Sequence, residues 1–181
     1  MPSSRATGLL LGYAADVYFA DPVRGHPVAG FGKVAGKLRE RWYADNRAAG
    51  AAYAATLVAG AAAVGVVAER FARRSPLLGT LATAAATWTV LGGRTLRREA
   101  AVMAGHLERG DLSAARGRLN HLCGRDPSAL DEPELARATV ESVAENTSDA
   151  VVAPLVWGGL AGLPWLLGYR AANTLDAMVG H

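Results

Sequence analysis

Long uncharged stretches alternate with polar segments along this chain. Three of these stretches cover residues 48–68, 75–93 and 150–169, and each is 19 to 21 residues long. A shorter apolar segment at 6–20 precedes them. A bilayer core needs about 20 apolar residues per helix. The pattern therefore predicts an all-α, multi-pass membrane protein with membrane segments at about 6–20, 48–68, 75–93 and 150–168.

The last of these segments, 150–168, differs from the others because prolines and glycines interrupt it. Broken apolar helices are tolerated at membrane depth where they line a cavity walled by protein. A complete crossing would also leave Asn173 and Asp176 on the far side from the other polar motifs. We therefore expect this segment to re-enter the membrane, or to pack without spanning it.

A polar helical insert is predicted at 94–149, between the third and fourth membrane segments. Apolar residues recur at helical spacing over 96–107 and again over 112–122, with Gly110 as the stop signal between them. These spacings predict a helical hairpin. A third helix then begins near Asp131, which is followed by a proline at a position typical of a first helical turn.

The third helix of the insert carries acids on one side. Glu141 and Glu145 are four residues apart and so share a face, and Asp149 follows one turn later. The opposite side is apolar and holds Ala136, Val140, Val143 and Ala144. Two interpretations remain open for this segment: a solvated helix surface, or the rim of a site at a membrane surface.

Composition supports the membrane prediction. The chain is 51% hydrophobic and only 19% charged, which is unusual for a soluble domain, although buried soluble helices remain an alternative. The net charge is +3, and no basic patch interleaved with aromatic residues is present, so we expect no nucleic-acid partner. The single cysteine, Cys123, excludes an intramolecular disulfide.

The positions of the lysines and arginines predict an orientation. Fourteen lie in the regions 20–47 and 94–149, whereas four lie in the regions on the other side. The positive-inside rule then places the polar motifs on the cytoplasmic side of the cell membrane. The basic helix expected within 30–47 fits an interfacial position there.

Two polar features near the N-terminus are candidates for function. Asp16 is an acid within an apolar segment, and such an acid is costly unless it faces a polar interior or lies at the interface. Asp21 and His26 each precede a proline, which biases both residues toward extended backbone in a stiff loop. Alone, this pair of motifs is more typical of an ordinary loop.

Taken together, the motifs resemble a family of membrane proteins of cobalamin biosynthesis, the adenosylcobinamide-phosphate synthases. The resemblance rests on Asp16 with Asp21-Pro22 and His26-Pro27-Val28, on Gly93-Arg94-Thr95-Leu96 and Gly124-Arg125-Asp126, on Glu141 to Asp149 followed by Ala153-Pro154-Leu155, and on Tyr169 to Gly180. These motifs follow in order over nearly the whole chain. Family members continue past the last motif, so the chain resembles an N-terminal portion, and Ala20 stands where the family usually has glycine.

The resemblance implies an ATP-dependent ligase that joins aminopropanol, or its O-phosphate, to adenosylcobyric acid through an amide bond. ATP and Mg²⁺ would be its cofactors, and the lipid bilayer and other membrane enzymes of the corrinoid pathway would be its partners. The sequence has no Walker glycine loop to assign to ATP. Mg²⁺ prefers oxygen ligands, and arginines bind phosphate through paired hydrogen bonds.

The roles expected for individual residues follow from this resemblance. The catalytic candidates are His26, Asp21, Arg94, Arg125 and Asp126, with His26 as the base. The candidates for binding substrate or cofactor are Asn146, Thr147, Asn173 and Asp16. The metal candidates are Glu141, Glu145, Asp149 and Asp176. A transporter with an acid-lined path and a non-catalytic membrane scaffold remain the alternative functions.

Overall fold

The computed structural model describes residues 2–20, 26–42, 44–122, 124 and 126–179, and these fold as helices and connections with no strand among them. The all-α prediction is confirmed. The elements are α1 (Pro2–Phe19), α2 (Pro27–Trp42), α3 (Arg47–Ala72), α4 (Pro76–Val90), α5 (Gly93–Glu108), α6 (Leu112–Leu119), α7 (Glu132–Thr147), the π-helix η1 (Ser148–Val152), α8 (Ala153–Ala161) and α9 (Leu163–Val179).

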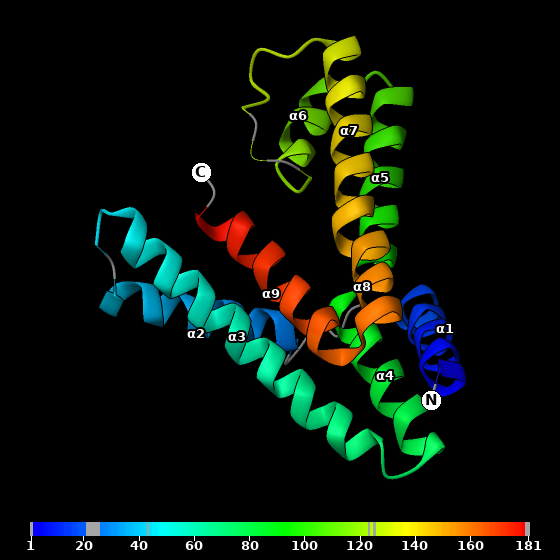
Figure 1. Ribbon diagram of the computed structural model, residues 1–181. Helices are drawn as coiled ribbons and strands as arrows, with labels where there is room; N and C mark the ends of the chain where they lie inside the picture. Colours follow the sequence, from blue (N-terminus) through cyan, green and yellow to red (C-terminus); the bar gives the residue numbers. More distant parts are fainter. Residues whose placement is uncertain (1, 21–25, 43, 123, 125, 180–181) are drawn as a thin grey trace.

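The helices form two parts (Figure 1). Helices α1, α2, α3, α4, α8 and α9 pack into a bundle, in which α3 lies along α9 and α1 lies along α4. Helices α5, α6 and α7 form a unit that projects from this bundle. The chain passes from the unit back to the bundle through η1, because α7, η1 and α8 follow one another without a loop.

Two glycines let α1 and α4 approach closely. A Cβ placed on Gly8 would lie 2.5 Å from the Cβ of Thr83, and a Cβ on Gly12 would lie 2.5 Å from the Cβ of Thr87. Gly8 and Gly12 are four residues apart, as are Thr83 and Thr87, so two matching faces meet. Small residues at this spacing are typical of helix pairs in membranes.

The projecting unit has its own core. Met103 of α5, Leu119 of α6 and Leu135 of α7 are fully buried against one another. The predicted start of α7 is confirmed, because the Asp131 side chain accepts a hydrogen bond from the Glu134 N–H at 2.9 Å while the Glu134 side chain bonds back to the Asp131 N–H. This pair of bonds satisfies two N–H groups that a helix start otherwise leaves open.

The apolar side of α7 differs from the sequence expectation. Leu135, Ala138 and Ser142 face α5 and α6 and are buried. Val140, which belongs to the apolar face read from the sequence, is 69% exposed, and Ala144 is exposed as well. The contact face of α7 is therefore rotated away from Val140, because α5 and α6 pack on its other side.

Among the described residues, α3 is the one helix long and apolar enough to cross a membrane. It contains the predicted segment 48–68. The predicted segment 6–20 overlaps α1, which ends at Phe19, and 75–93 covers α4 and reaches the first residue of α5. The segment 150–168 is divided between η1, α8 and α9, and the chain turns at Gly162, whose φ is +82°. The multi-pass arrangement stays a prediction.

Candidate functional site

A π-helix, η1, joins α7 to α8 in the described part of the chain. Pro154 is the second residue of α8, has no N–H to donate, and its ring crowds the carbonyl four residues earlier. The helix widens at this point, and the N–H of Ala153 bonds to the carbonyl of Ser148, five residues before it. Single π-helical turns inside α-helices are frequent at functional sites. Asp149 is the acid of this turn.

Asp149 is held against α9 by two neutral donors. The Asn173 side-chain amide donates to Asp149 Oδ2 at 3.4 Å, and the Tyr169 hydroxyl donates to Oδ1 at 3.5 Å. Arg170 donates to Asn173 Oδ1 at 3.2 Å and so extends the network. A carboxylate has about four acceptor positions, so Asp149 retains capacity for a metal ion or a further donor.

Tyr169 is confined to the role of donor in this network. Burial raises the pKa of its hydroxyl above the ordinary value, and the negative charge of Asp149 raises the pKa further. The hydroxyl therefore keeps its proton at neutral pH. Asp149 then receives hydrogen bonds from two uncharged donors.

The structure brings Asp16 and Arg94 together at the junction of α1 and α5. Asp16 is fully buried, and its Oδ2 accepts the backbone N–H of Arg94 at 3.2 Å. A negative charge at a helix N-terminus is favoured by the helix dipole. The Arg94 guanidinium donates to the carbonyl oxygens of Val17 and Tyr18, the latter at 2.9 Å, and so caps the end of α1. In this geometry Asp16 and Arg94 connect α1 to α5. The predicted binding role of Asp16 and the predicted catalytic role of Arg94 stay predictions.

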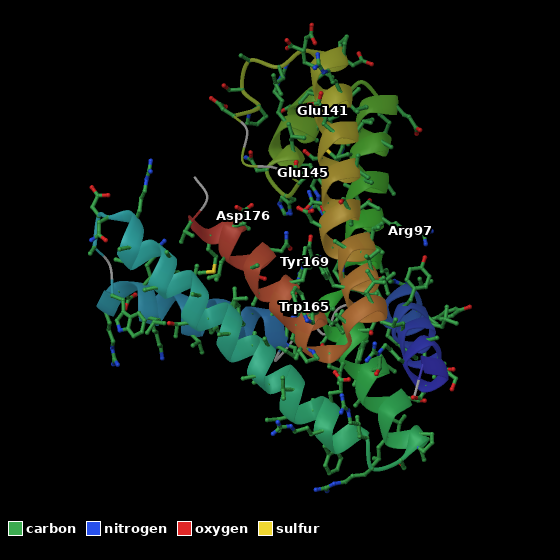
Figure 2. All side chains as sticks on the ribbon, viewed as in Figure 1. Arg97, Glu141, Glu145, Trp165, Tyr169 and Asp176 are labelled. Atoms are coloured by element: carbon green, nitrogen blue, oxygen red, sulfur yellow. The ribbon has the colours of Figure 1, made fainter. Side chains whose placement is uncertain are left out.

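The four predicted metal ligands come from three elements, α7, η1 and α9, and Figure 2 labels Glu141, Glu145 and Asp176 among them. Glu141 and Glu145 lie on α7, and Asp176 lies across from that helix on α9. All three are exposed, and Glu141 forms an ion pair with Arg137 at 2.8 Å. Among the described residues, no three histidine, cysteine or acidic side chains lie close enough together to hold a metal ion. Glu141, Glu145, Asp149 and Asp176 are thus not gathered into one site here.

Asn146 and Thr147 bond mainly within their own helix. Asn146 donates to the carbonyl of Ser142 at 2.8 Å and to that of Leu122 at 3.3 Å, which ties α7 to the chain that follows α6. The Thr147 hydroxyl donates to the carbonyl of Val143 at 2.7 Å. Their predicted part in substrate or cofactor binding stays a prediction.

The remaining candidates lie in turns or outside the described residues. His26 precedes α2, and its Nδ1 accepts the N–H of Val28 at 3.1 Å. Asp126 accepts the N–H of Ser128 at 3.0 Å, and this hydrogen bond lowers the pKa of its carboxyl. Asp21 and Arg125 lie outside the described residues.

Tyr169 and Arg170 are not among the site residues predicted from the sequence, although both belong to the last family motif. Tyr169, Asn173 and Asp176 recur at spacings of four and three, which places them on one helical face. That spacing could have grouped Tyr169 with the two predicted residues. Its contact with Asp149, 20 residues earlier, could not be read from the pattern.

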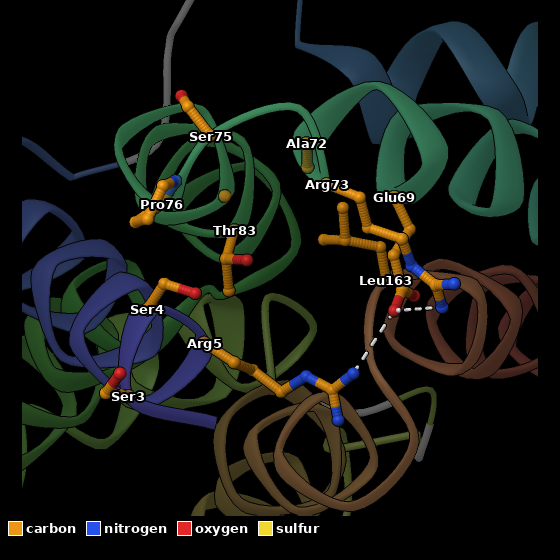
Figure 3. Close-up of a pocket in the computed structure, with 11 residues that line it drawn as sticks. Ser3, Ser4, Arg5, Glu69, Ala72, Arg73, Ser75, Pro76, Thr83 and Leu163 are labelled. Atoms are coloured by element: carbon orange, nitrogen blue, oxygen red, sulfur yellow. Dashed lines mark hydrogen bonds and ion pairs between the residues drawn. The ribbon is translucent and has the colours of Figure 1, made fainter. Parts of the chain in front are cut away.

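A second polar cluster closes the far end of the bundle (Figure 3). Arg5 of α1 and Arg73, directly after α3, both reach the carboxylate of Glu69, at 3.2 and 3.4 Å. They line a cavity of about 120 Å³ together with serines from α1 and from the turn before α4. Arg5 also donates to the carbonyl of Gly159 at 3.4 Å. The cluster ties the ends of α1, α3 and α8 together.

The fold and these contacts define an all-helical protein with a helix of membrane-spanning length and a polar network around a π-helical turn. Residues 9–181 match the model of the CobD/Cbib protein family. The chain belongs to this family. No solved structure matches it.

Curated relatives support the assignment. The chain is 50% identical over 179 residues to the cobalamin biosynthesis protein CobD of Mycobacterium tuberculosis (strain ATCC 25618 / H37Rv), which covers 98% of this chain and 56% of the relative. It is 42% identical to the protein of that name from Geobacter metallireducens, over 92% of this chain and 54% of the relative. The Rhodobacter capsulatus protein of that name is 40% identical, over 87% of this chain and 51% of the relative. The chain spans about half the length of these relatives.

Proposed function

We propose that this chain is part of a membrane enzyme of cobalamin biosynthesis, which joins aminopropanol or its O-phosphate to adenosylcobyric acid in an ATP-dependent reaction. The observation that carries the proposal is 50% identity over 98% of this chain to a protein named for cobalamin biosynthesis. The reaction itself comes from the motif resemblance described above. The polar network around Asp149 supplies the proposed location of the chemistry.

The membrane location is supported by length and by exposed apolar side chains. With 26 residues, α3 is about 39 Å long, more than the roughly 30 Å of a hydrocarbon core. Large apolar side chains of neighbouring helices are exposed, including Leu10 at 70%, Leu77 at 67% and Leu160 at 75%. Water disfavours an apolar surface of this extent. We propose that lipid covers it, and that the cell membrane contains α1, α4 and α8 as well as α3.

The polar network would then lie at the cytoplasmic face. An accessible-cysteine experiment tests this topology, with Cys123→Ser as the background and Asp176→Cys as the reporter. A thiol reagent that does not cross the membrane should label residue 176 in inside-out vesicles and leave it unlabelled in intact cells. Labelling of intact cells would contradict the proposed side.

Formation of the amide requires an activated carboxylate, a neutral amine and the exclusion of water. ATP would convert the corrinoid carboxylate into a better acyl donor, and Mg²⁺ would neutralise the phosphates. The available oxygen ligands fit Mg²⁺, since it needs only one or two carboxylates and completes its shell with water and phosphate oxygens. Asp149 and Glu145, one turn apart on α7 and η1, would hold it.

The residues of this chain would have separate tasks around that ion. Asn173 and Tyr169 hold the Asp149 side chain in place, and Tyr169 stays protonated because burial raises its pKa. His26 would be the general base that accepts the proton of the incoming ammonium. The buried Asp16 and the Arg94 guanidinium fix α5 against α1 and so position the projecting unit.

Complementation tests this function. The intact gene that encodes these residues should restore cobalamin synthesis in a strain that lacks this step. Asp149→Asn keeps the shape and removes the charge, and it should fail to restore growth. Glu132→Gln is the matched control, because Glu132 is an exposed acid in the first turn of α7 and should restore growth fully. Full activity of Asp149→Asn would remove Asp149 from the site.

A further inference from the structure

A groove runs along the outer side of the projecting unit, between α5 and α7. Its walls are Ala100, Ala104 and Leu107 of α5 and Ala136, Val140 and Ala144 of α7, and we call it the α5–α7 groove. It encloses about 450 Å³, and no charged residue lines it. The hydroxyl of Thr139 at its floor already donates to the carbonyl of Leu135 at 2.7 Å.

Nothing in the described part of the chain covers this groove. Val140 is 69% exposed, and Ala104 and Ala144 are exposed on the two walls. Helix α6 packs on the other side, where Leu119 contacts the core formed with Met103 and Leu135. An exposed apolar groove with no charged residue in its lining is a candidate docking surface.

The shape of the groove fits a helix. The lining residues span 100–107 on α5 and 136–144 on α7, so the groove is about 12 Å long, the length of about two helical turns. Small side chains on the walls allow another backbone to come close. The same protein already packs α1 on α4 in this way through Gly8 and Gly12.

The family supplies a source for such a helix. The match covers 56% of the Mycobacterium tuberculosis relative, so a large part of that protein has no counterpart in this chain. We infer that the α5–α7 groove docks an apolar helix from that part of the family chain. The inference rests on family membership and does not depend on the proposed reaction.

This docking would leave the acidic face of α7 accessible. At about 100° per residue, Glu141 and Glu145 are turned about 100° and 140° away from Val140. A helix in the groove would therefore lie beside the carboxylates and not over them.

Coexpression in two pieces tests the inference. Tagged residues 1–181 are produced together with a separate polypeptide, namely the part of the Mycobacterium tuberculosis relative that this chain does not match. Recovery of that polypeptide on the tag is measured after mild detergent extraction. Ala104→Glu places a charge in the groove and should lower recovery at least tenfold.

Ala101→Glu is the matched control, because Ala101 is exposed on the same helix but does not line the groove. It should recover the polypeptide as well as the unchanged chain does. Ala144→Glu repeats the test on the opposite wall, and far-UV circular dichroism should show equal helix content for all three variants.

Three results would overturn the inference. The first is full recovery with both Ala104→Glu and Ala144→Glu. The second is no recovery with the unchanged chain. The third is self-association of residues 1–181 that Ala104→Glu abolishes, since a second copy would then be the occupant.

Discussion

Replacing Gly12 with alanine tests the packing of α1 on α4, on which the position of Asp16 depends. A Cβ at residue 12 would lie 2.5 Å from the Cβ of Thr87 and 2.7 Å from the carbonyl oxygen of Ala84. Thr87 is fully buried and cannot turn aside. The helices would have to separate by about 1 Å, because carbon atoms in contact sit about 3.5–4.0 Å apart.

The expected cost follows from two opposing effects. Overpacking a tight interior costs about 1–3 kcal/mol, and the upper end applies because one of the crowded atoms belongs to the backbone. Replacing glycine with alanine in a helix interior raises the free energy of unfolding by about 1 kcal/mol. We therefore expect Gly12→Ala to lower the free energy of unfolding by about 2 kcal/mol.

Gly60→Ala on α3 is the control, since a Cβ at residue 60 meets nothing within 4 Å. It gains the same helix preference without the crowding and should be as stable as the unchanged protein or more stable by up to about 1 kcal/mol. Both variants are measured by equilibrium unfolding in mixed detergent micelles, followed by far-UV circular dichroism. The packing argument is refuted if Gly12→Ala proves as stable as Gly60→Ala.

Three further predictions concern single contacts. Asp131→Ala removes the side-chain oxygen that accepts the Glu134 N–H in the capping box of α7 and should lower the free energy of unfolding by about 1 kcal/mol in the same assay. A lysine at position 94 lacks the planar guanidinium that donates to the carbonyl oxygens of both Val17 and Tyr18. Arg94→Lys should therefore lower the melting temperature. Arg97→Lys, on the same exposed turn of α5, should not. Tyr169 has a raised pKa when folded, so its contribution is present below its ordinary pKa of about 10 and is lost as pH rises through the folded value. Tyr169→Phe should therefore show a shallower loss of stability than the unchanged protein above about pH 10, and equal slopes would contradict the burial of this hydroxyl.

Much of the helical framework could be predicted from the sequence because it depends on local signals. The capping residue Asp131 and the stop at Gly110 act within one turn, and both work as expected. The long uncharged run 48–68 needs no tertiary information to form α3. Family motifs in order were sufficient to identify the family, which the comparison with known proteins confirms.

The packing faces could not be predicted, because they depend on contacts between distant segments. The apolar residues of α7 occupy more than half of its circumference, so the pattern could not show that Leu135 and Ala138 would be buried and Val140 left exposed. The widened turn at Ser148–Val152 is another example. It carries Asp149, whose contacts with Asn173 and Tyr169 join segments 20 or more residues apart.

The account depends most on the claim that Asp149 lies in the site of an ATP-dependent ligase. Membranes that contain the product of the intact gene are incubated with adenosylcobyric acid, aminopropanol or its phosphate, ATP and Mg²⁺, and amide formation is followed by mass spectrometry. We expect a product that requires both ATP and Mg²⁺, with a rate at least 100-fold lower for Asp149→Asn and unchanged for Glu132→Gln. Product formed equally well by Asp149→Asn, or without ATP, would contradict the account.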